Sequence, residues 1–467
     1  MWDFETNSDK VAAINEQGER LLYSGLLAEV HNVEPLLRDR PLVFLLCSNT
    51  LGALMGYVGC IENRAVPLLL SSHLDKELLA ELISRYKPDY LWAPSHMAGA
   101  FSEYGAVYES FSYMLLETGF HHVYPLFENL CLLLTTSGST GSPKLVRQSD
   151  TNVFENANSI MQYLELDDSE RPITTLPMNY TYGLSIINSH LLVGATLLMT
   201  DKGLMQKEFW QFLKEMDATS FGGVPYTYEM LERLRFERMQ LPSLRTMTQA
   251  GGKLTPELHE KFATYAAETQ KKFIVMYGQC EATARMGYLP AEKAVEKKGS
   301  MGIAIPGGAF HLEDEDGIQI TAPYTTGELI YMGKNVTLGY AERGEDLIKG
   351  DEWHGILRTG DMAQVDEDGY YYIVGRKKRF LKIYGNRVNL DEIDRLVKGR
   401  FSVECVSAGV DDHLCLFVTD AGIAPEIRTF AAAKTGLHPS AFRLVVLDEI
   451  PKNDAGKPLY QELEKYC

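Results

Sequence analysis

Long apolar stretches and an excess of positive charge are both missing from this sequence. No uninterrupted apolar run reaches the roughly 18 residues that a membrane-spanning helix needs, so we expect no such helix. The start, MWDFETNSDK, lacks the basic and apolar regions of a secretory signal peptide, and the expected location is the cytoplasm. The 45 Lys and Arg residues are outnumbered by 63 Asp and Glu residues, for a net charge of −18. Because nucleic-acid binding needs a basic face, this balance argues against a nucleic acid as the main partner.

Metal-binding and disulfide patterns are also missing. The seven cysteines form no CxxC pair and the histidines form no HExxH motif, so the sequence predicts neither a zinc site nor a disulfide framework. We find no internal repeat, low-complexity tract or Gly/Ser-rich linker. At 467 residues, of which 45% are hydrophobic, the chain is long enough for about two to four folded units with a large core.

Strand-like and helix-like segments alternate through about the first 300 residues. Residues 42–46 and 130–134 are short apolar runs typical of buried strands. Residues 78–86 and 153–164 instead carry apolar side chains at the spacing of one helix face. This alternation predicts an α/β fold with a substantial parallel sheet.

The pattern changes near residue 300. Residues 310–320 and 363–375 each have the pattern of a strand, an acidic Asp-Gly turn and a second strand, which predicts two hairpins. Neither acidic run continues to the Glu that completes a calcium loop, so we interpret both as exposed turns rather than cation sites. The last ~90 residues combine helical and strand-like patterns and predict a small α+β unit. Its expected boundary is the stretch GRKKR, residues 375–379.

The first motif that suggests chemistry is a loop directly after the apolar run 130–134. In this loop, TTSGSTGSPK at residues 135–144, glycines and small hydroxyl side chains allow backbone N–H and side-chain O–H groups to surround a polyphosphate. Lys144 adds a positive charge. A Walker loop needs Gly directly before its Lys, and Pro143 occupies that position, which disfavours a P-loop NTPase.

A second motif, YGQCE at residues 277–281, follows the apolar segment 273–276. The ring of Tyr277 can stack on a flat base, and Gly278 lets the backbone come close to it. The carboxylate of Glu281 is a suitable ligand for Mg²⁺, which would partly neutralise bound phosphates.

Three further segments supply one carboxylate and several positive charges. Asp361, in the turn RTGD, is suited to accept hydrogen bonds from two ribose hydroxyls. Residues 375–385 hold five cations within eight residues, which in an acidic protein indicates contact with an anion. Lys457 follows a Gly in the segment PKNDAGK, residues 451–457, and is expected to lie on a loop.

Together, in this order and spacing, the five segments resemble the adenylate-forming superfamily of acyl-CoA synthetases, nonribosomal-peptide adenylation domains and beetle luciferases. The resemblance covers nearly the whole chain. Shorter stretches that support it are residues 177–184, 223–225, 250–252, 299–302 and 327–329. The resemblance implies two half-reactions. A carboxylate first attacks the α-phosphate of ATP to give acyl-AMP and pyrophosphate, and a thiol then attacks the acyl-AMP and releases AMP.

The resemblance also implies a role for each candidate residue. The phosphate loop would be formed by Thr136, Ser137, Gly138, Ser139, Thr140, Gly141 and Lys144. The rest of the nucleotide would lie against Gly251, Gly252, Tyr277 and Gly278 at the adenine and against Asp361 and Arg376 at the ribose and phosphate. Glu281 would bind Mg²⁺, and Lys457 would bridge the reacting carboxylate and the α-phosphate.

By the same resemblance, the expected fold has a large N-terminal domain, residues 1–377, made of two α/β sheet subdomains and a β-barrel-like subdomain. A small, mobile α+β domain, residues 378–467, would follow it. This small domain would rotate between the half-reactions about a hinge at Lys378, withdrawing Lys457 from the site. Lys382 would then lie near the pantetheine of the thiol.

The acyl pocket is expected around one group of residues: Tyr180, Tyr182, Gly223, Val224, Gly251, Met276 and Gly302. Its tyrosines and methionine predict a small pocket that is partly polar or suited to an aromatic acid. Amino-acid-activating relatives typically place an Asp near the position of Asn179 to pair with the substrate amine. No carboxylate stands there, which disfavours an α-amino acid.

Three residues depart from the pattern of the superfamily. Cys280 replaces a common Thr beside Glu281, and because a thiol is a weaker hydrogen-bond donor we expect adenylation to be reduced but not abolished. The pair Asn179-Tyr180 replaces an aromatic residue followed by His, and Arg379 stands where Asp is frequent.

The thiol acceptor stays open between coenzyme A and the phosphopantetheine of a separate carrier protein, since no carrier sequence follows Cys467. A CoA ligase is our first interpretation, and an enzyme that loads an acyl or aminoacyl group onto a carrier is the second. A protein that binds an adenylate without catalysis is a third, which the presence of Lys457, Asp361 and Glu281 disfavours.

Overall fold

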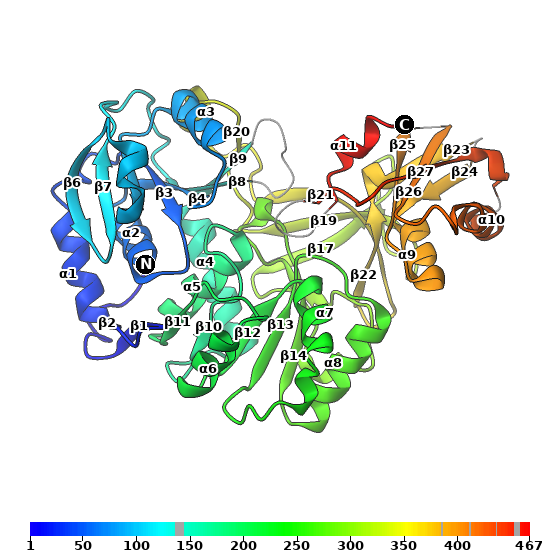
Figure 1. Ribbon diagram of the computed structural model, residues 1–467, viewed down its shortest axis with the longest axis horizontal. Helices are drawn as coiled ribbons and strands as arrows, with labels where there is room; N and C mark the ends of the chain where they lie inside the picture. Colours follow the sequence, from blue (N-terminus) through cyan, green and yellow to red (C-terminus); the bar gives the residue numbers. More distant parts are fainter. Residues whose placement is uncertain (136–143, 384–385, 411, 436, 453–457) are drawn as a thin grey trace. The chain divides into compact units, whose positions relative to one another are not determined.

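The computed structural model describes residues 1–135, 144–383, 386–410, 412–435, 437–452 and 458–467 (Figure 1). These residues separate into two compact units, which are described one at a time. The first unit is built from residues within 1–309 and 331–357, and the second from residues within 310–330 and 358–467. Among the described helices, none combines the length and the apolar character that crossing a membrane requires.

One sheet of the first unit has eight strands in the order β20-β9-β8-β4-β3-β5-β7-β6. Its strands are β3 (Leu42–Cys47), β4 (Val66–Ser71), β5 (Tyr90–Pro94), β6 (Gly105–Ser110), β7 (Tyr113–Glu117), β8 (Leu130–Thr135), β9 (Leu145–Ser149) and β20 (Gly339–Ala341). The central strands β5, β3, β4 and β8 are parallel. Strand β3 is apolar and buried along its whole length, as expected where both faces of a sheet are covered.

A second sheet of the first unit has nine strands in the order β16-β15-β14-β13-β12-β10-β11-β1-β2. Its strands are β1 (Val11–Asn15), β2 (Arg20–Leu22), β10 (Pro172–Ile173), β11 (Leu197–Met199), β12 (Ser220–Gly223), β13 (Thr246–Gln249), β14 (Lys272–Tyr277), β15 (Gly287–Tyr288) and β16 (Ile303–Ala304). Strands β12, β13 and β14 run parallel, with Gly223 opposite Gln249 and Gln249 opposite Val275. Their carboxyl ends therefore meet at one edge of the sheet.

Helices α2, α4 and α5 join the two sheets through one shared apolar core, and Figure 1 shows α4 and α5 between them. The helices of this unit are α1 (Tyr23–Val33), α2 (Leu51–Glu62), α3 (Lys76–Tyr86), α4 (Asp150–Leu164), α5 (Thr181–Leu192), α6 (Lys207–Glu215), α7 (Pro225–Arg233) and α8 (Pro256–Glu268). Ser149 caps the start of helix α4, and its side chain and that of Asn152 form a reciprocal capping box. The strand–helix alternation confirms the α/β fold expected from the sequence.

The second unit contains a five-stranded sheet in the order β18-β17-β19-β21-β22. Its strands are β17 (Gly308–Glu313), β18 (Gln319–Ile320), β19 (Gly327–Gly333), β21 (Ile356–Val365) and β22 (Tyr371–Arg376). Both expected hairpins are present. Asp314 Oδ1 accepts the backbone N–H of Ile318 at 2.8 Å, and Asp366 Oδ1 accepts that of Tyr370 at 2.9 Å. These carboxylates stabilise the turns themselves, as the turn interpretation requires.

The remainder of the second unit is a small α+β fold. Its elements are β23 (Phe380–Ile383), β24 (Asn386–Asn389), α9 (Leu390–Phe401), β25 (Cys405–Val410), β26 (His413–Val418), α10 (Ala424–Thr435), β27 (Phe442–Val446) and α11 (Tyr460–Glu464). An apolar core lies between β25–β26–β27 and the helices α9 and α10. The expected α+β unit is thereby confirmed.

The five-stranded sheet occupies the position in the chain of the expected barrel-like subdomain. Its strands pack into the same compact unit as the α+β fold, whereas the expected boundary placed them in the domain of residues 1–377. This grouping describes how the strands pack and does not test whether the α+β fold rotates. A hinge at Lys378 therefore stays a prediction.

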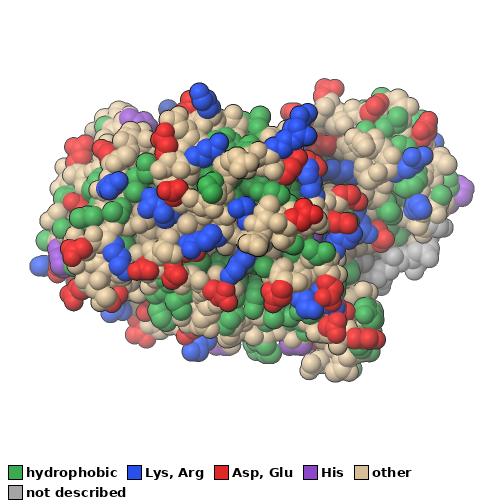
Figure 2. Space-filling view, turned by 90° about the horizontal axis from the view of Figure 1, so that it is seen from below, with side chains coloured by type: hydrophobic (Ala, Val, Ile, Leu, Met, Phe, Trp, Pro, Cys, Tyr) green, Lys and Arg blue, Asp and Glu red, His purple; other side chains and the backbone are tan. Residues whose placement is uncertain are grey.

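Acidic and basic side chains are mixed on one face of the protein (Figure 2). Figure 2 shows Lys and Arg interspersed among Asp and Glu on the face drawn there. Exposed pairs in the first unit include Lys298 with Glu260 at 2.7 Å and Lys293 with Glu296 at 2.7 Å. Such exposed pairs stabilise a fold by about 0–1 kcal/mol each, so the cores described above dominate.

Candidate active site

The candidate site of the first unit begins at the shared edge of β12, β13 and β14. Gly223 ends β12, Gly251 is the second residue after β13, and Tyr277 ends β14. Ligands of open α/β sheets bind outside the carboxyl ends of the parallel strands. The fold therefore brings three of the expected site residues to the edge where a ligand is expected.

Two glycines at this edge have steric reasons to be glycine. A β-carbon at Gly278 would lie 1.5 Å from the carbonyl oxygen of Ala284, so no other residue fits without moving the backbone. Gly251 has φ of +83°, and a β-carbon there would lie 2.8 Å from the hydroxyl oxygen of Tyr180. The next residue, Gly252, lies close to the ring of Pro225, and a β-carbon on Gly252 would lie 3.0 Å from the Pro225 Cγ.

Glu281 lies on a one-turn 3-10 helix, Cys280–Ala282, directly after this edge. Its Oε1 accepts a hydrogen bond from the hydroxyl of Tyr340 at 2.7 Å. Its backbone carbonyl accepts the N–H of Thr337 at 3.0 Å and the Thr337 hydroxyl at 3.1 Å. Burial, followed by the neighbouring Glu281 carboxylate, raises the pKa of Tyr340, which keeps this hydroxyl protonated as a donor. Glu281 is thus fixed by two residues from a distant part of the chain.

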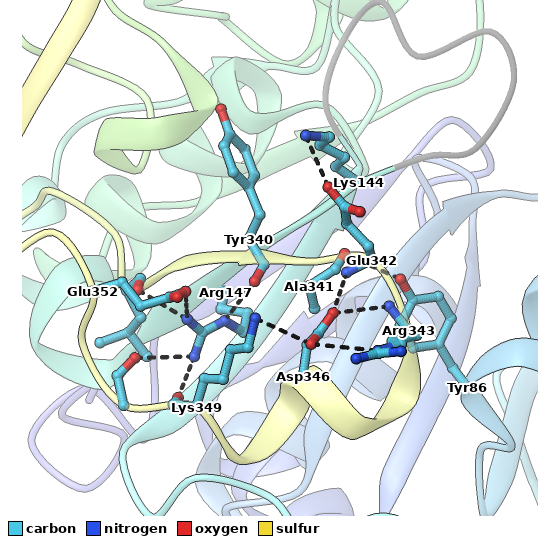
Figure 3. Close-up of polar contacts among 12 residues, drawn as sticks. Tyr86, Lys144, Arg147, Tyr340, Ala341, Glu342, Arg343, Asp346, Lys349 and Glu352 are labelled. Atoms are coloured by element: carbon cyan, nitrogen blue, oxygen red, sulfur yellow. Dashed lines mark hydrogen bonds and ion pairs between the residues drawn. The ribbon is translucent and has the colours of Figure 1, made fainter.

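Lys144 lies beside the ring of the same tyrosine (Figure 3). Its Nζ lies 5.4 Å from the centroid of the Tyr340 ring and 2.8 Å from Oε1 of Glu342. The two charged side chains are 52% and 61% exposed. An ion pair this exposed is weak and easily exchanged, so Lys144 can transfer to another anion at little cost. Tyr340 therefore links the expected phosphate-loop lysine to the expected metal ligand.

A completely buried arginine holds the strand that carries Tyr340. Arg147 donates to the carbonyls of Leu338 and Tyr340, each at 3.0 Å, and to Glu352 Oε2 at 2.6 Å (Figure 3). It also contacts the carbonyl of Lys349. A depression of about 530 Å³ lies beside this network and is lined by Tyr340, Glu342, Arg343, Asp346, Lys349, Glu352 and Trp353. Arg147 thereby fixes both Tyr340 and the wall of this depression.

Most of the expected acyl-pocket residues lie in one apolar cluster. Tyr182 and Met276 are buried in it, and Tyr180 and Val224 pack against it. The Tyr182 hydroxyl lies 2.8 Å from the Thr248 hydroxyl. Gly223 and Gly251 flank this group, as described above. Gly302, with φ of +86°, lies against the carbonyl of Tyr288, whose ring packs on the same cluster.

Asp361 and Arg376 face each other in the second unit. They are paired across the antiparallel strands β21 and β22, and Arg376 Nε lies 3.7 Å from Asp361 Oδ1. Thr359 Oγ1 accepts the backbone N–H of Asp361 at 3.1 Å. The two residues assigned to the ribose and phosphate therefore share one end of one hairpin.

Part of the expected site lies outside the described residues. Thr136, Ser137, Gly138, Ser139, Thr140, Gly141 and Lys457 lie outside the described residues. The backbones of Lys378 and Lys382 lie in a 3-10 helix, Lys377–Arg379, and in β23. Their roles stay predictions.

Two residues of this region were not predicted from the sequence. Tyr340 lies 59 positions after Glu281, and only a Gly-Tyr pair preceding an acidic segment marked it. Arg285 lies four residues after Glu281 and is 2% exposed. A lone Arg near an apolar run was its only signal, because its contacts come from other segments.

A family model, several relatives and several solved structures match this chain. A family model described as AMP-binding enzyme matches residues 2–341. The 2-succinylbenzoate–CoA ligase of Bacillus pumilus (strain SAFR-032) is 28% identical over 338 residues, 70% of this chain and 66% of that protein. The oxalate–CoA ligase of Arabidopsis thaliana is 28% identical over 345 residues, 70% of this chain and 65% of that protein. The chain thus spans just under two thirds of the length of these two relatives.

One solved structure with the same fold is that of o-succinylbenzoate CoA synthetase from Bacillus subtilis in complex with its acyl-adenylate intermediate. It aligns over 97% of this chain and 95% of that chain with a TM-score of 0.78, at 21% identity. At this identity the likeness establishes the fold.

Proposed function

The chain belongs to the family of AMP-binding enzymes, and we propose that it is an AMP-forming acid–thiol ligase. In this proposal a carboxylic acid and ATP form acyl-AMP and pyrophosphate, and a thiol then takes the acyl group and releases AMP. The observation that carries the proposal is the set of contacts linking Lys144, Tyr340 and Glu281, which joins two segments assigned to the phosphates. The named relatives are CoA ligases, which supports a thiol as the acceptor.

The residues around Glu281 fit a magnesium ion. Mg²⁺ usually binds through one or two carboxylates together with water and substrate phosphates, and it does not require a dedicated protein cage. Tyr340 occupies Oε1 of Glu281, and the described residues give no hydrogen-bond partner to Oε2. When bound, the ion would neutralise part of the phosphate charge. Tyr340 would orient the carboxylate for this role, as groups bonded to metal ligands commonly do.

The chain's own side chains would position the reactants. Lys144 would leave Glu342 for a phosphate, since their exposed pair is weak. Tyr277 and the backbone at Gly251 would hold the adenine at the sheet edge. In the second unit, Asp361 would accept the ribose hydroxyls beside Arg376. This preorganisation acts on geometry and charge, which are the main requirements of adenylyl transfer.

The second half-reaction is proposed from three lysines. Lys457 would act in adenylation, Lys378 would be the hinge of the rotation, and Lys382 would lie near the pantetheine of the thiol. Coenzyme A is our first choice of acceptor. A separate acyl carrier protein is the alternative, because both present the same phosphopantetheine thiol.

The test is ATP–pyrophosphate exchange with a panel of fatty, aromatic, hydroxy and amino acids, followed by AMP release with CoA or with a pantetheinylated carrier protein. Exchange with any free acid supports adenylation. CoA-dependent AMP release supports the ligase, and labelling of the carrier with no response to CoA supports the loading enzyme. If the protein binds ATP but shows no pyrophosphate exchange with any of the acids, it is a non-catalytic adenylate-binding protein and the proposal is wrong.

A further inference from the structure

Arg285 places a positive charge among neutral groups. The side chain is 2% exposed, and its guanidinium carbon lies 4.1 Å from the centroid of the Tyr182 ring. Nε donates to the Ser185 hydroxyl at 3.1 Å, and Nη1 lies 3.4 Å from the Tyr163 hydroxyl and contacts the sulfur of Met276. A hydroxyl, a phenol, a thioether and an aromatic ring carry no negative charge that would balance the guanidinium.

No described carboxylate pairs with Arg285. The described residues contain no ion pair to it, and they provide no hydrogen-bond acceptor for its Nη2. The undescribed residues 136–143 of the same part of the chain, TSGSTGSP, contain no Asp or Glu and cannot supply an anionic side chain. The charge is therefore not balanced within the first unit.

The other two buried arginines of the described chain do have carboxylate partners. Arg147, which is 0% exposed, donates to Glu352 at 2.6 Å. Arg379, which is 8% exposed, pairs with Asp391 at 2.8 Å and with Asp394 at 2.7 Å. Because an unpaired buried charge is strongly unfavourable, Arg285 differs from both in a way that calls for an external anion.

The position of Arg285 indicates where such an anion would come from. Its contacts Tyr182 and Met276 belong to the apolar cluster that contains the expected acyl-pocket residues. His190, whose pKa is lowered to about 4 by burial and further by the charge of Arg285, is neutral at pH 7 and adds no second cation. A single fixed positive charge thus lies at the acyl end of the site.

We propose that Arg285 binds a second carboxylate of the substrate, so that the enzyme activates a dicarboxylic acid at its other carboxylate. This inference rests on the proposed ligase function. A carboxylate can take two N–H donors of a guanidinium, and exclusion of water strengthens the attraction between the two charges. A substrate that ends in a methyl group would leave the Arg285 charge without a partner. Binding sites discriminate strongly against analogues that leave a buried polar group without its hydrogen-bond partner.

The test compares acids that differ only at the far end: succinate with butyrate, glutarate with valerate, adipate with hexanoate, and phthalate with benzoate. In pyrophosphate exchange, the wild type should have at least about tenfold higher kcat/KM for one dicarboxylic acid than for its matched monocarboxylic acid. Arg285→Met should remove this preference, and Arg285→Lys, which keeps the charge without the planar fork, should keep part of it. Arg171→Met is the matched control, since Arg171 is a partly buried arginine outside the cluster that donates to the carbonyl of Met216 at 2.6 Å.

Thermal unfolding separates binding from a structural role. Without ligand, Arg285→Met should melt at the same temperature as the wild type or higher, because it removes an unbalanced charge. The preferred dicarboxylic acid should raise the melting temperature of the wild type and not that of Arg285→Met. A dicarboxylate preference that survives in Arg285→Met overturns the inference. Exchange with monocarboxylic acids alone overturns the inference and leaves the ligase function intact, whereas exchange with no acid at all overturns both.

Discussion

The hydrogen bond from Tyr340 to Glu281 provides the sharpest test of the proposed metal site. Tyr340→Phe removes only the hydroxyl and leaves the ring beside Lys144. A hydrogen bond to a charged group stabilises a protein by about 1.5–3 kcal/mol. If this energy serves to orient the carboxylate for Mg²⁺, its loss corresponds to roughly 10–100-fold in metal affinity or in activity.

The assay is pyrophosphate exchange titrated with Mg²⁺ at a fixed ATP concentration. Tyr340→Phe should need a roughly tenfold higher Mg²⁺ concentration for half-maximal rate, or should lose a similar factor in the maximal rate. Tyr108→Phe is the matched control, because the Tyr108 hydroxyl donates to Glu29 Oε2 at 2.6 Å in the same unit, among residues assigned no role in the site. Unchanged Mg²⁺ dependence in Tyr340→Phe, or equal losses in both variants, would refute the role assigned to this bond.

Four other variants test the remaining assignments. Lys457→Ala should reduce carboxylate-dependent pyrophosphate exchange at least about 100-fold and leave thiolysis of supplied acyl-AMP largely intact, and equal loss of both would contradict its role. Lys378→Pro should spare exchange and lower thioester formation, because proline fixes φ at the hinge, and normal thioester turnover would exclude the hinge. Cys280→Thr should exchange pyrophosphate as fast as the wild type or faster, since a hydroxyl is the better donor, and a large loss would show that the thiol has another task. For His190, burial lowers the pKa from 6.5 to about 4. Between these pH values the side chain is protonated in the unfolded chain and neutral in the folded chain. The free energy of unfolding, at its full value above pH 6.5, should therefore fall by roughly 3 kcal/mol as the pH falls toward 4. In denaturation curves measured at pH 7 and pH 4.5, His190→Gln should show a smaller fall than the wild type.

Arg379 shows how the structure explains a departure that the sequence only flagged. The resemblance described above implies a frequent Asp at this position, where this chain has Arg379. In the second unit its guanidinium bonds to Asp391 and Asp394 of α9 and lies 4.4 Å from the centroid of the Tyr460 ring. Arg379 therefore fastens the segment after Lys378 to the α+β fold, which keeps that fold a single body on one side of the proposed hinge.

Local patterns were sufficient for the fold class and for most of the candidate site. Apolar runs and helical spacing predicted the α/β order, because a buried strand or helix face must be apolar wherever it packs. Motifs such as YGQCE and RTGD marked Glu281 and Asp361, because the residues of each motif are adjacent in the chain. The expectation that RTGD forms a turn was wrong, since these residues lie within strand β21. The sequence alone thus determined the fold class and which segments are the candidates for the proposed adenylate chemistry.

Only the tertiary structure could show which distant groups complete those segments. Tyr340 reaches Glu281 because β20 pairs with β9. Arg285 has no carboxylate partner among the described residues, because the three separate segments that contact it offer only neutral groups. Neither contact can be predicted from the periodicity or the local motifs of the sequence, because strand pairing and burial depend on residues far apart in the chain. The physical reason is that charge balance is a property of the folded interior: whether an arginine is neutralised by its own protein or by a substrate is decided by what packs around it.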